Sequence, residues 1–180
     1  MSTATPLSQK ISQKISADKA RRKNTLSKMN KKAPYFWLST WFGSGLILPA
    51  SGTWGTVFSV PFAIAAYYFG GAPALMICAV VIFFIGLWSS HQFEKLSGEH
   101  DHSMIVIDET AGYFIAAAAV NGSALSFFLA FLLFRFFDAV KPWPIGWIDK
   151  KVSGAFGVMI DDVVAGILSA FALWGIHGYI

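Results

Sequence analysis

Apolar stretches separated by short polar breaks fill most of the chain after residue 50. Five of them cover 54–69, 72–90, 104–120, 124–137 and 157–177. A helix needs about 20 apolar residues to cross the hydrocarbon layer of a membrane, with a workable range of about 17–25. The pattern therefore predicts an all-α fold, a polytopic membrane helical bundle with about five transmembrane or membrane-embedded helices.

Glycine and proline interrupt the apolar pattern in two ways. The pair at 70–71 and the "NGS" at 121–123 are turn residues between successive runs. Residues 35–53 are also apolar, but glycines and prolines break them throughout. Irregular backbone at membrane depth needs protein or water around it. We therefore expect a re-entrant or interfacial segment near 35–53.

Composition supports a membrane protein over a soluble one. The chain of 180 residues is 55% hydrophobic, and only 13% of its residues are charged. A soluble domain usually has about 25% charged residues. The balance therefore favours an integral membrane protein with a single embedded domain.

Positive charge is concentrated at the N-terminus. Residues 1–32 carry nine lysines and arginines and one acid, Asp18. The segment lacks the apolar centre of a secretory signal, so we expect a basic cytoplasmic tail, disordered or weakly helical, before a membrane-embedded domain at 33–180. The positive-inside rule places this tail and the loops 91–103 and 138–156 in the cytoplasm. Nucleic-acid binding is the competing interpretation of a basic tail, and its direct continuation into apolar sequence argues against it.

Two acid pairs stand near the start of apolar runs, Asp108-Glu109 and Asp161-Asp162. Ionised carboxylates at membrane depth are costly and usually face an interior site or a partner. Few cations lie nearby in the sequence, whereas one divalent ion neutralises several carboxylates, and Mg²⁺ prefers such hard oxygen ligands. The helix dipole also favours acids in a first helical turn, which explains a single exposed pair. We expect metal ligation for the two pairs together.

The segments around the two pairs resemble each other. "VIDETAG" (106–112) and "MIDDVVAG" (159–166) each place small residues after the acids. Small residues allow membrane helices to approach closely. The two pairs are therefore expected to meet at one site.

A base, an acid and a second base follow the fourth apolar run. On a helix Arg135 and Asp138 share a face, whereas Lys141 precedes Pro142 and is expected to leave the helix. Interfacial anchoring explains the bases and the nearby tryptophans but not the acid. We expect a phosphate site in which the bases hold anionic oxygens and Asp138 binds metal or water.

Two loops supply further candidates. In "ASGTWGT" (50–56), Thr53 is expected to cap the following helix, whose N-terminus favours an anion. In "GEHDHS" (98–103), Asp101 is a candidate oxygen ligand near Asp108, and the histidines are expected to be ordinary polar loop residues.

Taken in order, "GSGLILPASGTWGT", "HDHSMIVIDETAG", "FRFFDAVKPWPI" and "GVMIDDVVAG" closely resemble the motifs of the phosphatidylglycerophosphatase A family. The resemblance runs from about Trp37 to about Ser169. It implies a Mg²⁺-dependent phosphatase of the bacterial inner membrane. The apolar runs and the positive-inside rule add the expectation of a multi-pass protein with its N-terminus and active site on the cytoplasmic side. The implied reaction converts phosphatidylglycerophosphate to phosphatidylglycerol and inorganic phosphate, in phospholipid biosynthesis.

The resemblance also implies roles for individual residues. The implied metal ligands are drawn from Asp101, Asp108, Glu109, Asp161 and Asp162, the implied catalytic acids are Asp108, Asp138, Asp161 and Asp162, and the implied substrate-binding residues are Gly52, Thr53, Arg135 and Lys141. One departure concerns the loop before Thr53, because Ser51 stands where the family often has proline.

Two other functions remain open. A phosphatase acting on another lipid phosphate, such as a polyprenyl phosphate, has the same requirements. Intramembrane acids also mark the paths of small metal or ion transporters. A transporter needs polar residues through the whole span, whereas here they cluster on one predicted face. We expect the partner to be a phospholipid substrate in the membrane, and no nucleic acid.

Overall fold

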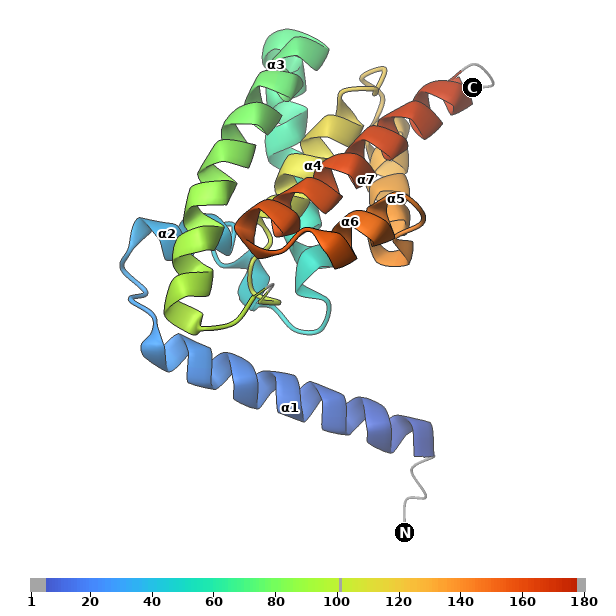
Figure 1. Ribbon diagram of the computed structural model, residues 1–180. Coiled ribbons are helices and arrows are strands. Elements are labelled where there is room, and N and C mark those ends of the chain that lie inside the picture. Colours follow the sequence, from blue (N-terminus) through green and yellow to red (C-terminus); the bar gives the residue numbers. More distant parts are fainter. Residues whose placement is uncertain (1–5, 101, 178–180) are drawn as a thin grey trace.

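The computed structural model describes residues 6–100 and 102–177, and all regular structure in these ranges is helical (Figure 1). The elements in chain order are α1 (Pro6–Lys28), α2 (Pro34–Ser39), the 3₁₀ helix η1 (Ser44–Leu46), α3 (Ser51–Ser97), α4 (Ile107–Ala117), α5 (Ala124–Val140), α6 (Ile145–Lys151) and α7 (Gly154–His177). The predicted all-α class is confirmed.

The longest helix, α3, doubles back on itself. Gly70 and Gly71 leave helical geometry, and the chain reverses there (Figure 1). Gly71 has a φ of 64°, a backbone conformation that side chains with a Cβ rarely adopt. Because of the reversal, Ser51 at the start of α3 and Glu94 near its end line the same pocket.

Two helices of the described ranges are long and apolar enough to cross a membrane, Ser51–Ser97 and Gly154–Ile176. This number is lower than the five or so predicted. The first two apolar runs belong to α3 alone. The third and fourth runs form helices of only 11 and 17 residues, because irregular backbone and turns take up their ends.

The short helix α4 lies in the core. Nine of its eleven residues are buried, and the Thr110 hydroxyl shares a 2.8 Å hydrogen bond with Ser59 of α3. On the outer helices, in contrast, large apolar side chains stay exposed, including Phe69 (92%), Phe128 (56%) and Trp174 (74%). Soluble monomers rarely expose apolar surface on this scale. The outer faces of α3, α5 and α7 are therefore suited to a lipid environment.

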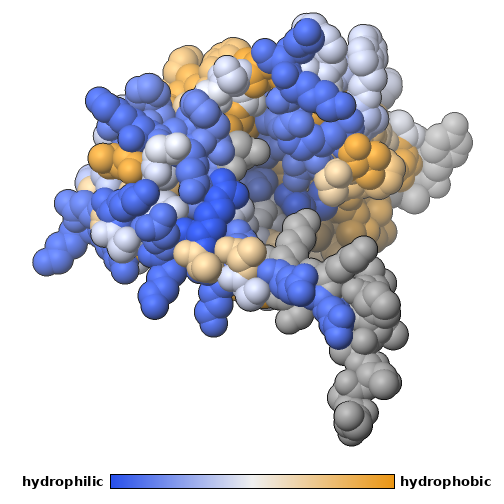
Figure 2. All heavy atoms as spheres, turned by 60° about the horizontal axis from the view of Figure 1, so that its bottom comes forward, coloured by the Kyte–Doolittle hydropathy of each residue, from blue (hydrophilic) through white to orange (hydrophobic). Residues whose placement is uncertain are grey.

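The N-terminal segment differs from the expected disordered or weakly helical tail. It contains the helix α1, which lies across one end of the bundle (Figure 1). The molecular face at this end is mostly hydrophilic, with apolar side chains at its margins (Figure 2). Residues 35–50 form most of α2, η1 and turns, with a left-handed Gly43, and residues 51–53 begin α3. That is the irregular backbone predicted, and its depth in a membrane stays a prediction.

Candidate active site

The helices α4 and α7 approach each other through two glycines. A Cβ on Gly112 would lie 2.6 Å from the carbonyl oxygen of Asp162 and 2.5 Å from the ring of Phe134. A Cβ on Gly166 would collide with the carbonyl oxygen of Gly112. Small residues thus allow the close contact that the two similar sequence segments predict. As a result, the first turn of α4, with Asp108 and Glu109, faces the third turn of α7, which begins at Asp162.

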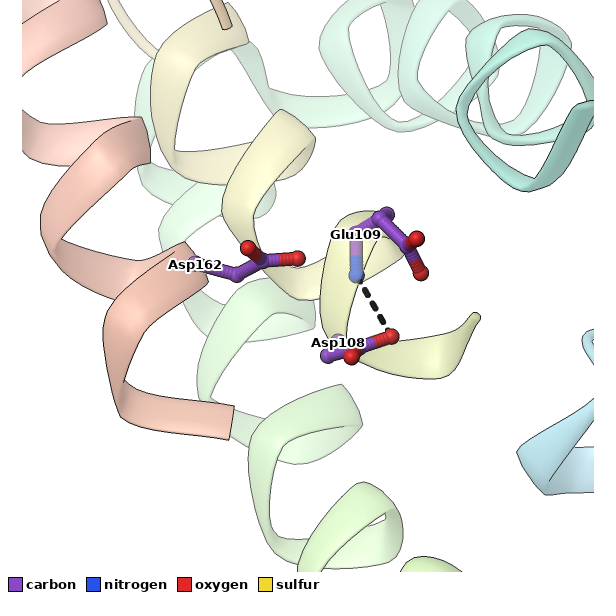
Figure 3. Close-up of side chains that lie close together, drawn as sticks. All are labelled: Asp108, Glu109 and Asp162. Atoms are coloured by element: carbon purple, nitrogen blue, oxygen red, sulfur yellow. Dashed lines mark hydrogen bonds between the residues drawn. The ribbon is translucent and has the colours of Figure 1, made fainter. Parts of the chain in front are cut away.

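This contact brings three carboxylates together. One oxygen from each of Asp108, Glu109 and Asp162 lies within 4.8 Å of the others. In Figure 3, Asp162 points from α7 toward the two acids of α4. The Glu109 backbone N–H donates to Asp108 Oδ1 over 3.0 Å, which orients the Asp108 side chain. Three oxygens this close together repel each other strongly unless protons or a cation neutralise them.

The carboxylate group opens into a pocket of about 610 Å³ at the α1 end of the bundle. Among the residues predicted for the site, those that line it are Gly52, Asp108, Glu109, Arg135, Asp138, Lys141, Asp161 and Asp162. Thr53 is not among the lining residues, and Asp101 lies outside the described residues. The structure therefore collects most of the predicted site residues from four helices and one helix end.

Arg135 and Asp138 form an ion pair on one face of α5. Arg135 Nη1 lies 2.5 Å from Asp138 Oδ2, which confirms that the two side chains share a face. A Cβ on Gly52 would lie 3.3 Å from Arg135 Nη1 and would collide with Glu109 Oε1. Glu109 and the Arg135 guanidinium therefore both lie close to Gly52 at the start of α3.

Lys141 leaves the helix as predicted, since α5 ends at Val140 and Lys141 has a φ of 46°. Its ammonium donates to Asp149 over 2.5 Å and to Asp161 over 2.6 Å. Burial lowers the pKa of Lys141, but the two carboxylates outweigh burial, and the net pKa lies above its ordinary value. The ammonium is therefore held charged, between α6 and α7.

Asp161 thus occupies a different position from the one predicted. Its Oδ2 accepts from Lys141, and its Oδ1 accepts from the backbone N–H of Asp162 over 3.0 Å. The close group of three carboxylates contains Asp162 and not Asp161. Adjacent residues on a helix point in directions about 100° apart. Asp162 therefore reaches the carboxylates of α4, and Asp161 reaches Lys141.

The predicted cap on α3 is wrong. The N-cap position is Ala50, in left-handed geometry and without a side-chain hydrogen bond, and Thr53 lies inside the first turn. Ser51, which stands where the family often has proline, makes hydrogen bonds through its hydroxyl group. Its hydroxyl donates to the carbonyl oxygen of Ser103 over 2.5 Å and accepts from Arg22 over 3.0 Å.

Sequence reasoning missed several residues at the pocket. Asp149 shares Lys141 with Asp161, and Glu94 and Ser103 also line the cavity. Asp149 lies in "WIDKK", which has the pattern of an ordinary charged helix end, so no local pattern distinguishes it. The buried His102, expected to be a polar loop residue, is fully enclosed and contacts Thr25 of α1.

The chain is similar in sequence to several known proteins. A family model described as phosphatidylglycerophosphatase A matches residues 37–177. A "Phosphatidylglycerophosphatase A" of Haemophilus influenzae is 38% identical over 86% of this chain and 95% of its own length. A protein of the same name from Escherichia coli is 39% identical over 82% of this chain and 86% of its own length.

A third relative differs in its named substrate. A Bacteroides thetaiotaomicron protein whose name provisionally gives it phosphatidylinositol-3-phosphatase activity is 37% identical over 76% of this chain and 92% of its own length. No solved structure matches the chain. With a family model covering most of its length and two curated relatives above 35% identity, the chain belongs to the phosphatidylglycerophosphatase A family.

Proposed function

We propose that this chain is a Mg²⁺-dependent lipid phosphatase that hydrolyses phosphatidylglycerophosphate to phosphatidylglycerol and inorganic phosphate. The observation that carries the proposal is one pocket that holds three converging carboxylates together with Arg135 and Lys141. Carboxylates that gather beside fixed cations suit an ion and a phosphoryl group bound side by side.

The donor set fits Mg²⁺. All three ligand groups are carboxylates, the hard oxygen donors that this ion takes in proteins. Glu109 Oε2 is buried and has no hydrogen-bond partner among the described residues, so its lone pairs are open to a ligand. Asp108, Glu109 and Asp162 would hold the ion. When bound, it would polarise the phosphoryl group and lower the pKa of a coordinated water.

The remaining residues act on the substrate. Arg135 binds the oxygens of the terminal phosphate, and the Asp138 carboxylate holds the guanidinium by the 2.5 Å ion pair. Lys141, fixed by Asp149 and Asp161, supplies a second positive charge. As water attacks phosphorus and the bond to the glycerol oxygen breaks, these charges stabilise the oxygens on which negative charge accumulates. The attacking water loses a proton as it forms the new P–O bond, and the glycerol oxygen takes up a proton and leaves as an alcohol, so the reaction consumes one water and releases inorganic phosphate.

We also propose a multi-pass position in the bacterial inner membrane, with the N-terminus and the pocket at the cytoplasmic face. Exposed apolar side chains on α3, α5 and α7 support burial in lipid. Lysines and arginines of α1 and α6 gather at the pocket end, which is the distribution that the positive-inside rule describes. Labelling of a single cysteine introduced at Ser153, in a variant with Cys78 replaced by alanine, tests this orientation. A membrane-impermeant reagent should react only after the cytoplasmic side is opened.

Phosphate release from the purified protein in detergent tests the activity. Phosphatidylglycerophosphate is compared with a phosphatidylinositol phosphate and a polyprenyl phosphate, each with and without Mg²⁺. We expect Mg²⁺-dependent release, fastest from phosphatidylglycerophosphate. The Bacteroides relative gives a specific reason to include the inositol lipid, and faster release from it would replace the proposed substrate. Absence of phosphate release from all three lipids would refute the proposed activity.

A further inference from the structure

One buried arginine of α1, Arg22, contacts two residues that line the pocket, Ser51 and Ser103. Arg22 is 5% exposed, although the residues around it on α1 are mostly solvent-exposed. A buried guanidinium is costly unless its N–H groups are satisfied. Because Arg22 is buried while most bases of α1 are exposed, its contacts are expected to compensate the cost of burying its charge.

These contacts join α1 to two parts of the chain that are far from it in the sequence, the stretch from Gly45 to Ser51 and the loop at Ser103. Arg22 Nη1 donates to the Gly45 carbonyl oxygen over 2.9 Å. Nη2 lies 3.0 Å from Ser51 Oγ and 3.0 Å from both the carbonyl oxygen and Oγ of Ser103. Asp18, one turn earlier on α1, lies 3.1 Å from Nε. The planar guanidinium of Arg22 thus connects η1, the start of α3 and the loop before α4.

The segments that Arg22 connects lie next to the proposed metal ligands. Ser51 and Ser103 line the pocket. Gly52 follows Ser51, and its α-carbon packs so closely on Glu109 Oε1 that a Cβ would collide. Displacement of Ser51 therefore displaces the surface against which Glu109 rests. Arg22 itself is not among the residues that line the pocket.

We propose that Arg22 is a positioning residue of the phosphatase site, which holds Ser51 and Gly52 so that Glu109 keeps its place beside Asp108 and Asp162. The inference rests on the proposed function. The residue lies outside the region matched by the family model, which begins at residue 37. The α1 helix therefore contributes to the site from a part of the chain that the family match does not cover.

The first test does not depend on activity. Hydrogen exchange is measured on wild type, Arg22→Ala, Arg22→Lys and Lys23→Ala in detergent. Lys23 is an exposed neighbour on α1, so Lys23→Ala removes the same charge without the contacts. We expect exchange in the segment 44–52 to accelerate about tenfold or more in Arg22→Ala, because hydrogen bonds to a charged donor are lost. Lys23→Ala should match wild type. Equal exchange in Arg22→Ala and wild type overturns the proposal.

The second test measures kcat and KM. We expect kcat to fall about tenfold in Arg22→Ala, with KM changed less than about twofold, because small misplacements of a reacting group lower turnover strongly. Arg22→Lys should recover part of kcat, since an ammonium reaches some of the same acceptors. If Arg22 acts through Ser51, adding Ser51→Ala to Arg22→Ala should lower kcat no further. Fully additive losses, or an equal loss in Lys23→Ala, overturn the proposal.

The outcomes separate the two hypotheses. If wild type releases no phosphate, the proposed function fails, and the exchange experiment still decides whether Arg22 holds the segment 44–52. If wild type is active and Arg22→Lys, Arg22→Ala and Ser51→Ala all keep wild-type kcat, the positioning role fails alone. Should Arg22→Ala not fold, Arg22→Lys and Ser51→Ala carry the same comparison.

Discussion

Gly166 of α7 lies against the backbone of Gly112 of α4, so closely that a Cβ on Gly166 would collide with the Gly112 carbonyl oxygen. The contact sets the distance between the two helices that carry the acids. It is therefore the packing feature on which the carboxylate group depends.

Gly112→Ala should destabilise the protein and lower its activity together. The added methyl group would meet the Phe134 ring at 2.5 Å and the Asp162 carbonyl oxygen at 2.6 Å, and overpacking of this kind costs about 1–3 kcal/mol. The helices must separate, which moves Asp162 away from α4. Thermal unfolding in detergent should show a lower Tm. Gly175→Ala is the matched control, because nothing lies within 4 Å of its Cβ position, and its Tm should not fall.

Gly52→Ala should lower activity while leaving stability nearly unchanged. Its Cβ would collide with the end of the flexible Glu109 side chain, which can move away at little cost to the fold. Alanine in a helix is also intrinsically favoured over glycine, by about 0.5–1 kcal/mol. We expect kcat to fall about 10–100-fold, with a Tm within a few degrees of wild type. Wild-type kcat in this variant would show that the position of Glu109 does not matter.

Asp162→Asn should abolish Mg²⁺-dependent turnover, with a fall of at least about 10²-fold. It should also weaken the stabilisation that Mg²⁺ confers, because an ion that binds only the folded state raises Tm by mass action. The measurement is Tm against Mg²⁺ concentration, with and without a chelator. Glu99→Gln, which removes an acid that contacts Arg21 rather than the pocket, should keep the wild-type response. An unchanged Mg²⁺ response in Asp162→Asn would exclude Asp162 as a ligand.

Acidification should loosen the contact between α1 and the loop before α4. His102 Nδ1 accepts from the Met104 N–H over 3.2 Å, so the neutral ring carries its proton on Nε2, 3.1 Å from the Thr25 hydroxyl oxygen. Burial, and then the nearby charge of Arg21, lowers the pKa of His102 from its ordinary value of 6.5. Below pH 6.5 the unfolded imidazole therefore binds a proton that the folded one excludes.

The sign of this effect is a loss of stability as pH falls. The contribution of His102 is fully present above pH 6.5 and decreases as the pH drops below that value. Tm measured between pH 7.5 and pH 5 should fall more steeply for wild type than for His102→Gln, which cannot titrate. Parallel curves for the two proteins would contradict the assignment.

The sequence predicted the parts of the site that depend on local pattern. The acid pairs and the small residues after them correctly predicted that α4 and α7 meet, and the spacing of Arg135 and Asp138 correctly predicted their common face. The number of spanning helices was overestimated because apolar content alone does not show that α4 is enclosed by its neighbours. A buried core helix and a lipid-facing helix have similar composition.

The parts that were missed depend on contacts between distant segments. Nothing around Arg22 distinguishes it from the other bases of its segment; its role arises only when Gly45, Ser51 and Ser103 meet. Asp149 and His102 likewise acquire partners from other helices. Of the acid pair on α7, only the folded helix shows which member faces Lys141 and which faces the other carboxylates.

Because α3 reverses at Gly70 and Gly71, its beginning and its end lie at the same pocket. Ser51 and Glu94 both border the pocket, while the reversal lies at the opposite end of the molecule (Figure 1). Any tilt of this hairpin relative to α7 therefore shifts both borders together. The width of the pocket between these two borders and the residues of α7 that line it therefore depends on the angle between the hairpin and α7.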